Sequence, residues 1–237
     1  MEKESCFKMS ISAKKVFLVL SLITGFLVIC HLLKNYLGLP GGFAERFDMD
    51  VERSIPTWYS VTVLLFASII LLMIGVLKKQ ERDEHAFKWI LLSFLFLFMS
   101  IDESAMIHEL VGPLVGSITK ITSGYLTWGW YIPALAMAVF LGIYLFKYWL
   151  SLPKKIKFLF LLSAVIFIGG AVGAEMITAN YITTYSGLND PYTTGFYVVL
   201  SAVEEGMETI GVVVFIYALL LYLNSYSPKL DVLIEDK

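Results

Sequence analysis

The sequence of 237 residues is short of charge and of cysteine, and each scarcity excludes a class of protein. Only 16% of the residues are charged, against about a quarter in soluble domains, so a water-soluble globular domain is excluded. The two cysteines, Cys6 and Cys30, form no disulfide or thiolate metal motif. The lysines and arginines form no basic stripe, so nothing in the sequence indicates a nucleic-acid partner.

Long apolar runs account for the composition, which is 58% hydrophobic with a mean hydropathy of +0.76. Each run has about 20 residues, enough to cross a hydrocarbon core of about 30 Å. The first follows Lys14 and Lys15 and is too long for a signal-peptide core, so we expect a retained anchor. We predict an all-α integral membrane bundle of six transmembrane helices that forms a single domain over residues 1–237. The predicted spans are 16–38, 57–77, 87–109, 126–147, 157–180 and 197–223.

The basic residues predict which side of the membrane each connection faces. Fourteen lie in the two tails and in the connections 78–88 and 147–157, and four lie on the other side. Cytoplasmic segments carry the excess of lysine and arginine, so both termini should be cytoplasmic. Tryptophans near the span ends agree with interfacial anchoring: Trp58, Trp128 and Trp130 at outer ends, Trp89 and Trp149 at inner ends. A bacterial cytoplasmic membrane is the expected location.

Two stretches place acids where the solvent should be hydrocarbon: FMSIDESAMIHEL (98–110) in the third span and AVEEGMETIG (202–211) in the sixth. Only 15 residues, Thr209 to Leu223, follow Glu208, which is too few for a span of about 20. The three glutamates of the sixth span must therefore lie inside the membrane. Ionisable side chains at such depth are costly and normally face a bundle interior or a water-filled cavity.

Helix geometry supports a shared site in the outer half of the bilayer, with one limit. At 100° per residue, the glutamates of the sixth span occupy one arc about 100° wide. Glu103 and His108 differ by about 140°, so an unbroken helix cannot bring both to one point. Either the helix breaks near 104–107, or one of the two residues has another role. Gly169, Gly170 and Gly173 form a small-residue face that favours close helix packing beside Glu175.

Crowded carboxylates in low dielectric share protons or surround a cation. Together with two histidines, they form a set of hard oxygen and borderline nitrogen ligands. Such a set is better suited to iron, manganese, magnesium or calcium than to a zinc site of the thiolate type. We predict a divalent metal site, with iron, manganese or zinc as the candidate ions. The predicted metal ligands are Asp102, His108, Glu109, Glu175, Glu205, Glu208 and His31. The predicted catalytic residues are Glu204 and Glu103.

Some of these residues have plainer interpretations. Glu109 and Glu175, near span ends, could sit in the headgroup region. A lone histidine on an apolar helix, as His31 or His108, is often hydrogen-bonded to neighbouring backbone or side chains. In the outer loop 39–56, Asp48, Asp50 and Glu52 alternate. They either begin an acidic loop before the helix cap or belong to a lid that supplies a carboxylate such as Glu52 to the site.

The chain resembles a set of uncharacterised multi-pass bacterial membrane proteins. The resemblance rests on DMDVERSIPTWYS (48–60), SIDESAMIHE (100–109) and EEGMETIG (204–211), in that order. It implies that the three acidic pieces belong together, and it implies no activity.

Three functions fit the pattern. The first is a metalloenzyme whose site in the outer leaflet acts on a lipid, a quinone or a small extracytoplasmic molecule. The second is a cation or proton-coupled transporter. The substrate sites of transporters usually lie near the membrane midplane, between internal repeats, and the sequence shows no internal repeat. The third is a non-catalytic scaffold or sensor stabilised by a metal ion. Membrane lipids are the expected partners in all three, and the oligomeric state stays open.

Overall fold

The computed structural model describes residues 12–121, 123–185 and 190–226, and this part of the chain is helical with no β-strand. Five helices are long and apolar enough to cross a membrane, and the number is six if α3 and α4, which are bent by 85° at their junction, count as one span. The predicted all-α membrane bundle is therefore confirmed.

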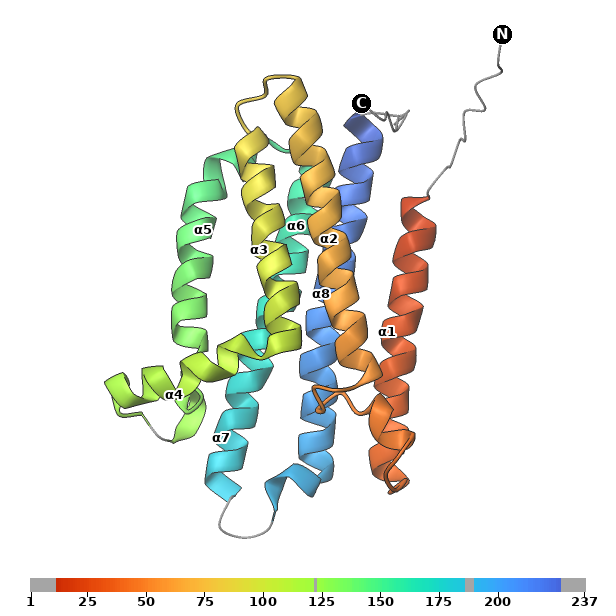
Figure 1. The fold of residues 1–237 in the computed structure, drawn as a ribbon, viewed down its shortest axis with the longest axis vertical. Helices are drawn as coiled ribbons and strands as arrows, with labels where there is room; N and C mark the ends of the chain where they lie inside the picture. Colours follow the sequence, from red (N-terminus) through yellow and green to blue (C-terminus); the bar gives the residue numbers. More distant parts are fainter. Residues whose placement is uncertain (1–11, 122, 186–189, 227–237) are drawn as a thin grey trace, which may run out of the picture.

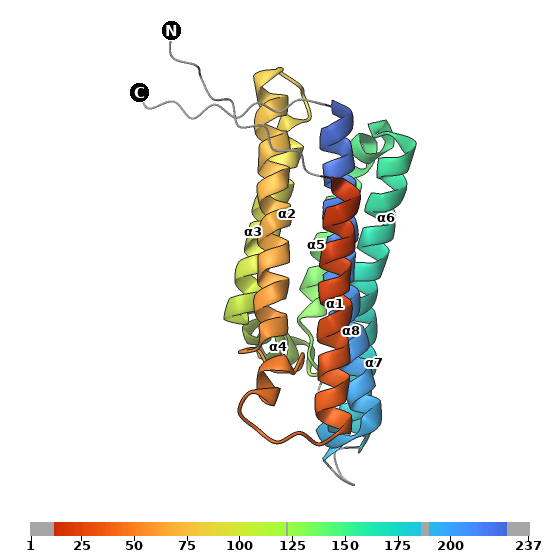
Figure 2. The same cartoon turned by 90° about the vertical axis from the view of Figure 1, so that its right-hand side faces the viewer.

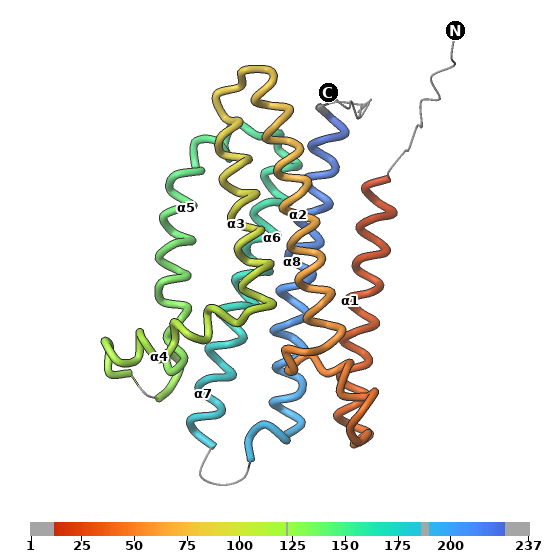
Figure 3. The backbone as a smooth tube through the Cα atoms, in the orientation of Figure 1, coloured from red at the N-terminus to blue at the C-terminus, as the bar shows by residue number. Residues whose placement is uncertain are grey.

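The helices that run along the bundle are α1 (Ala13–Tyr36), α2 (Ile55–Gln80), α3 (Ala86–Ala105), α5 (Tyr131–Ser151), α6 (Lys154–Ile168) and α8 (Gly195–Tyr226). A π-helix, η3 (Gly169–Ala174), joins α6 to α7 (Glu175–Tyr185) in one continuous column (Figure 3). Short 3-10 turns are η1 (Ala44–Phe47), η2 (Gly124–Leu126) and η4 (Pro191–Thr193). Helix α4 (Ile107–Thr119) lies across the bundle axis (Figure 1).

The ends of the bundle differ in charge. The start of α1, the end of α8 and the α2–α3 and α5–α6 turns lie at one end (Figures 1 and 2). The tails and these two turns are the segments that carry the lysine excess. They lie at one end of the bundle, as the positive-inside pattern predicts. The assignment of this end to the cytoplasm stays a prediction. The loop 37–54, α4 and η2 lie toward the opposite end.

Helix α8 is the centre of the bundle. It packs against α1, α2 and α6, and its residues Val213, Ile216 and Leu219 are fully buried. Large apolar side chains such as Phe94 and Ile143 instead point outward, with exposed fractions of 62% and 74%. This arrangement is expected where lipid, rather than water, surrounds the helices.

Trp89 differs from its prediction as an interfacial anchor. Its side chain is fully buried, and its ring packs against Tyr222 and Tyr148, with ring-centroid distances of 4.9 and 5.5 Å. The position near a span end was read correctly, but hydropathy does not show which face of a helix meets lipid. Trp89 lies on the face of α3 that packs into the bundle.

The third predicted span, 87–109, is interrupted. At Met106 the backbone turns left-handed, with φ 52° and ψ 41°, and α4 leaves α3 at 85°. A left-handed residue ends an α-helix because it breaks the repeating backbone hydrogen bonds. Of the two alternatives left by the positions of Glu103 and His108, the break between 104 and 107 is the one found. Helix α4 itself lies mostly in a stretch predicted as a connection.

The glycine face before Glu175 brings the α6–η3–α7 column against α8. A Cβ atom on Gly170 would lie 2.8 Å from the carbonyl oxygen of Glu204 and 3.0 Å from the amide nitrogen of Glu208. No larger residue fits at this contact without a shift of the backbone. Helix packing, the predicted role of these glycines, thus holds for Gly170, whereas a Cβ on Gly173 would meet nothing within 4 Å.

Candidate metal and substrate pocket

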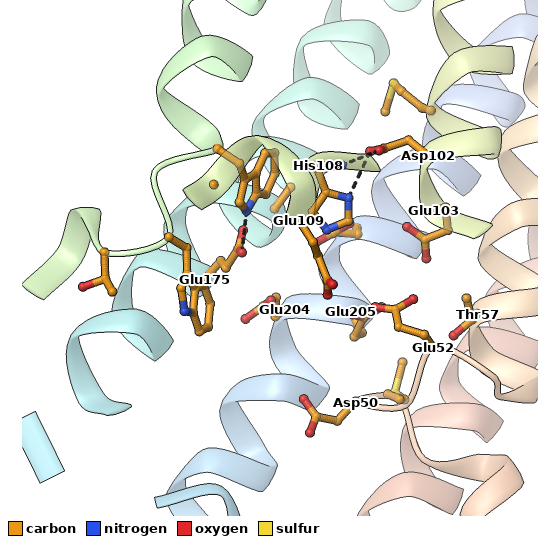
Figure 4. Close-up of a pocket in the computed structure, with 18 of the residues that line it drawn as sticks. Asp50, Glu52, Thr57, Asp102, Glu103, His108, Glu109, Glu175, Glu204 and Glu205 are labelled. Carbon is orange, nitrogen blue, oxygen red and sulfur yellow. Dashed lines mark hydrogen bonds and ion pairs between the residues drawn. The ribbon is translucent and has the colours of Figure 1, made fainter. Parts of the chain in front are cut away.

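A pocket of about 780 Å³ lies where the loop 37–54, α3, α4, η3, α7 and α8 meet. Nine carboxylate residues and one histidine line it (Figure 4). These residues are Asp50, Glu52, Asp102, Glu103, His108, Glu109, Glu175, Glu204, Glu205 and Glu208. We call this cavity the acidic pocket. No lysine or arginine is among the described residues that line it.

Eight of the nine predicted site residues line the acidic pocket, so the third, fifth and sixth predicted spans do meet there. The exception is His31, which does not line it. Glu52 reaches the pocket from the loop, as the lid hypothesis expects. Asp50, Trp130 and Tyr197 also line it and were not predicted, although the alternating acids of the loop were a signal for Asp50.

Asp102 and His108 form a pair across the helix break. One oxygen of the Asp102 carboxylate accepts a hydrogen bond from the backbone N–H of His108 at 2.8 Å, and the other lies 3.1 Å from His108 Nδ1. Asp102 therefore caps the start of α4 and, because a carboxylate accepts, holds the proton of the imidazole on Nδ1. In the neutral imidazole the other ring nitrogen, Nε2, then carries the lone pair, and it has no hydrogen-bond partner within the described part of the chain.

Trp130 connects this pair to Glu175. The indole N–H of Trp130 donates to Glu175 Oε1 at 2.7 Å, and its ring lies against the ring of His108 with centroids 5.0 Å apart. Glu175 is 9% exposed, so it is inside the protein rather than in the headgroup region. Glu175 is therefore not a headgroup-region residue, the plainer interpretation of its position near a span end. Glu109, by contrast, has an exposed side chain at the wall of the pocket.

The glutamates of α8 differ in their hydrogen bonds. Glu204 accepts one from the hydroxyl of Thr178 at 3.1 Å. Within residues 12–121, 123–185 and 190–226, Glu205, Glu208 and Glu103 form no hydrogen bond or ion pair. In Figure 4 the side chains of Glu52, Glu103, Glu109 and Glu205 extend toward the same space. For Glu103, Glu205 and Glu208, the described residues provide no lysine or arginine that pairs with the carboxylate.

Burial and neighbouring carboxylates also affect the two loop acids of the pocket, Asp50 and Glu52. Desolvation raises the pKa of Asp50, and the hydrogen bond from the Tyr197 hydroxyl, at 2.5 Å, offsets this only in part. Desolvation also raises the pKa of Glu52, and the negative charge of Glu109 adds to the effect. Both groups therefore take up protons at a higher pH than ordinary carboxyl groups do.

The side-chain positions set a limit on metal binding. Among the described residues, no three His, Cys, Asp or Glu side chains are arranged so that they could hold one metal ion in this conformation. Glutamate has three rotatable side-chain bonds, so its carboxylate can move by several ångströms without a change in the backbone. The donor chemistry fits a hard divalent ion, but the rotamers would have to converge on it.

The chain belongs to a family described as "Domain of unknown function (DUF8692)", whose model matches residues 16–223. This range includes every residue of the acidic pocket. Comparisons with curated proteins and with solved structures found no match. The chain thus belongs to a family of uncharacterised proteins, as the resemblance implied. The family match does not test the three motifs or a bacterial origin.

Proposed function

We propose that the acidic pocket binds a divalent metal ion and that the protein is a membrane-embedded metalloenzyme. The observation that carries the proposal is that nine carboxylates line one cavity, with no lysine or arginine among the described residues of its wall. So many carboxylates in a low dielectric need protons or cations to balance their charge. A divalent ion balances two of them and uses their oxygens as ligands.

His108 is the best-defined ligand in this proposal. Histidines that bind metals usually donate their second ring N–H to a carboxylate, which fixes the tautomer and the ring orientation. The hydrogen bond between Nδ1 of His108 and Asp102 has this form and leaves Nε2 with its lone pair. We therefore assign Asp102, which sequence reasoning made a ligand, to orienting His108.

Glu205 and Glu208 are the proposed carboxylate ligands, because they lie one turn apart on the central helix and form no hydrogen bond or ion pair with the other described residues. Glu109 and Glu175 are further candidates. Glu204 and Glu103 are the proposed general bases, which would act on a substrate or a water molecule near the ion. Iron, manganese and zinc remain the candidate ions, since the donors are carboxylates and an imidazole.

The shape of the pocket suggests an amphipathic substrate. Its wall also includes the apolar residues Leu64, Met99 and Phe167. On the far face of α4, Leu110, Leu114 and Ile118 are 75%, 61% and 73% exposed, spaced as on a helix that lies in a membrane interface. We infer that the pocket lies at the outer surface of a bacterial cytoplasmic membrane and takes a lipid, a quinone or a small extracytoplasmic molecule.

Replacing Asp102 by asparagine tests the proposed orientation of His108. The amide can still accept at one oxygen, but its NH₂ group cannot accept from an imidazole, so the ring loses its fixed tautomer. We expect the affinity for Mn²⁺ to fall by about 10–100-fold with one binding site retained. Titration of the purified protein, followed by the electron paramagnetic resonance of free Mn²⁺, measures it. An unchanged affinity would contradict the role given to Asp102.

The affinity for Mn²⁺ should also fall as the pH is lowered. Ligand carboxylates bind metal in their deprotonated form, so protons compete with the ion. Because the pKa values of Asp50 and Glu52 are raised, their negative charge is lost at a higher pH than that of free carboxyl groups. We expect the decline to begin at a higher pH than the ordinary titration range of carboxyl groups and to be shallower in Glu52→Gln. A flat profile in the wild type would count against carboxylate ligation.

A cation or proton-coupled transporter is the second candidate, favoured by the broken helix beside the pocket. The break at Met106 lies next to pocket carboxylates, and transporter sites are often built at such breaks; the π-helix before Glu175 is a second irregularity of the kind found at functional sites. Uptake of cations into proteoliposomes that is abolished by Glu208→Gln would support transport. Its absence, with Mn²⁺ bound, would leave the enzyme.

A further inference from the structure

His31 joins the loop 37–54 to two helices. The ring is 1% exposed, and its Nε2 lies 3.1 Å from the carbonyl oxygen of Val198 on α8. On the other side, Nδ1 lies 2.9 Å from a carboxylate oxygen of Asp48 and 3.0 Å from the backbone nitrogen of Met49. These are the contacts of a histidine bonded to backbone and side chain, the plainer interpretation left open by the sequence.

The ring can hold the loop in either of its protonation states. A carbonyl oxygen only accepts, so Nε2 must carry a proton. In the neutral ring, Nδ1 accepts from the N–H of Met49; in the protonated ring, Nδ1 donates to Asp48. Each state keeps one hydrogen bond to the loop and one to α8, but only the protonated ring donates to the Asp48 carboxylate; in the neutral ring the Nδ1 lone pair faces it at 2.9 Å.

Lys34, one helical turn after His31, forms an ion pair with the second oxygen of Asp48. Burial alone would raise the pKa of Asp48, but the hydrogen bonds from His31 and Lys34 outweigh it and hold the pKa well below its usual range. Asp48 therefore stays ionised over the whole physiological range. The loop is thus fixed to α1 at Asp48, whose carboxylate takes part in charge-assisted contacts with His31 and Lys34.

The segment that follows Asp48 is fixed at its other end as well. Thr57 donates its hydroxyl to the carbonyl oxygen of Val51 at 3.2 Å, and Ser54 caps α2 through the N–H of Thr57. Between these anchors lie the two loop carboxylates of the acidic pocket, Asp50 and Glu52. Asp50 is held further by the hydroxyl of Tyr197, on the turn of α8 that also carries Val198.

We infer that His31 is a positioning residue for the acidic pocket. Acting through Asp48 and Met49, it holds residues 48–52 so that Asp50 and Glu52 close the loop side of the pocket and add their negative charge to it. His31 thus controls cation affinity without lining the pocket. The inference rests on the proposed function, because affinity for a cation is its readout, while the position of the loop can be measured separately.

The test compares His31→Ala in two backgrounds. In the otherwise unchanged protein, we expect the affinity for Mn²⁺ to fall about 10-fold or more, as when other residues that orient a site are removed. In an Asp50→Asn/Glu52→Gln background, the same substitution should change the affinity by less than about 2-fold, because the loop charges it positions are already gone. Asp48→Asn is a second variant, to be used if His31→Ala folds poorly. It keeps the ring of His31 but removes the negative charge that the ring faces, and it should also lower the affinity for Mn²⁺.

Equal losses in both backgrounds, or no loss in either, would overturn the inference. Hydrogen exchange of the backbone amides provides the measurement that needs no metal. His31→Ala should speed exchange in residues 48–52, because the amide of Met49 loses its hydrogen-bond acceptor. Unchanged exchange in these residues would also overturn the inference. A wild type that binds no Mn²⁺ would instead contradict the proposed function, and the exchange data would still decide the anchoring role.

Discussion

Replacing Glu205 and Glu208 together by glutamine should lower the affinity for Mn²⁺ by at least about 100-fold, since removal of residues that only orient ligands already costs about 10–100-fold. Both carboxylates lie on the central helix, and neither has a hydrogen-bond partner in the described part of the chain. The substitution therefore removes charge and ligand oxygens without breaking a bond. The metal-free protein should keep its helical content and its unfolding temperature.

A matched control is Glu45→Gln in the turn η1, where the carboxylate is exposed and outside the acidic pocket. It removes one negative charge, where the double variant removes two, toward the same end of the bundle as the pocket, and should leave Mn²⁺ binding unchanged within about 2-fold. If the double variant bound Mn²⁺ as tightly as the wild type, Glu205 and Glu208 would not be ligands. If the control lost affinity equally, the effect would come from overall charge.

Replacing Gly170 by alanine should lower the free energy of unfolding by about 1–3 kcal/mol, the usual cost of overpacking. The added methyl group would meet the backbone of Glu204 and Glu208 at 2.8 and 3.0 Å, so α8 or the η3 segment has to shift. The backbone of α8 also carries the pocket glutamates. We therefore expect weaker Mn²⁺ binding together with the lower stability.

Gly173→Ala is the matched control, three residues along the same π-helix. Its methyl group would enter open space, and alanine favours helix over glycine by about 1 kcal/mol, so stability should stay equal or rise. Thermal unfolding in detergent, followed by circular dichroism, compares the two. Equal effects at the two positions would show that the close contact between Gly170 and α8 does not support the bundle.

The helices and the meeting of the acids could be predicted because both depend on properties counted along the chain. Apolar runs of about 20 residues identify membrane crossings whatever surrounds them. The number of residues after Glu208 predicted that it lies within the last span, and the structure has it within α8 (Gly195–Tyr226). The 140° separation of Glu103 and His108 likewise indicated a break as one alternative, because helix geometry is the same in every helix.

The hydrogen-bond partners could not be predicted, because they depend on how separate segments approach one another. The pairing of Asp102 with His108 requires the 85° bend at Met106, a residue with no special tendency to turn left-handed. Trp130 was expected as a membrane anchor, but it donates to Glu175, 45 residues away in sequence. Neither contact leaves a periodic signal in the sequence.

His31 illustrates the same limit. Its place on α1 suggested a residue at the depth of the acids, which made it a candidate ligand. Only the path of the loop 37–54 brings Asp48 and Met49 back onto its ring, and loop paths are set by contacts at both ends rather than by composition. The acids of the loop were visible in the sequence, whereas the residue that positions them was not.

Elemental analysis of the wild-type protein purified in detergent tests the central claim most directly. Inductively coupled plasma mass spectrometry on the folded protein, beside an Asp102→Asn/Glu205→Gln/Glu208→Gln triple variant, measures the metal bound per chain. The proposal predicts iron, manganese or zinc in stoichiometric amount in the wild type and its loss in the variant. A well-folded wild type that holds no metal, and takes up none when Mn²⁺ is supplied, would contradict the metalloenzyme and leave proton-coupled transport as the better account of the acidic pocket.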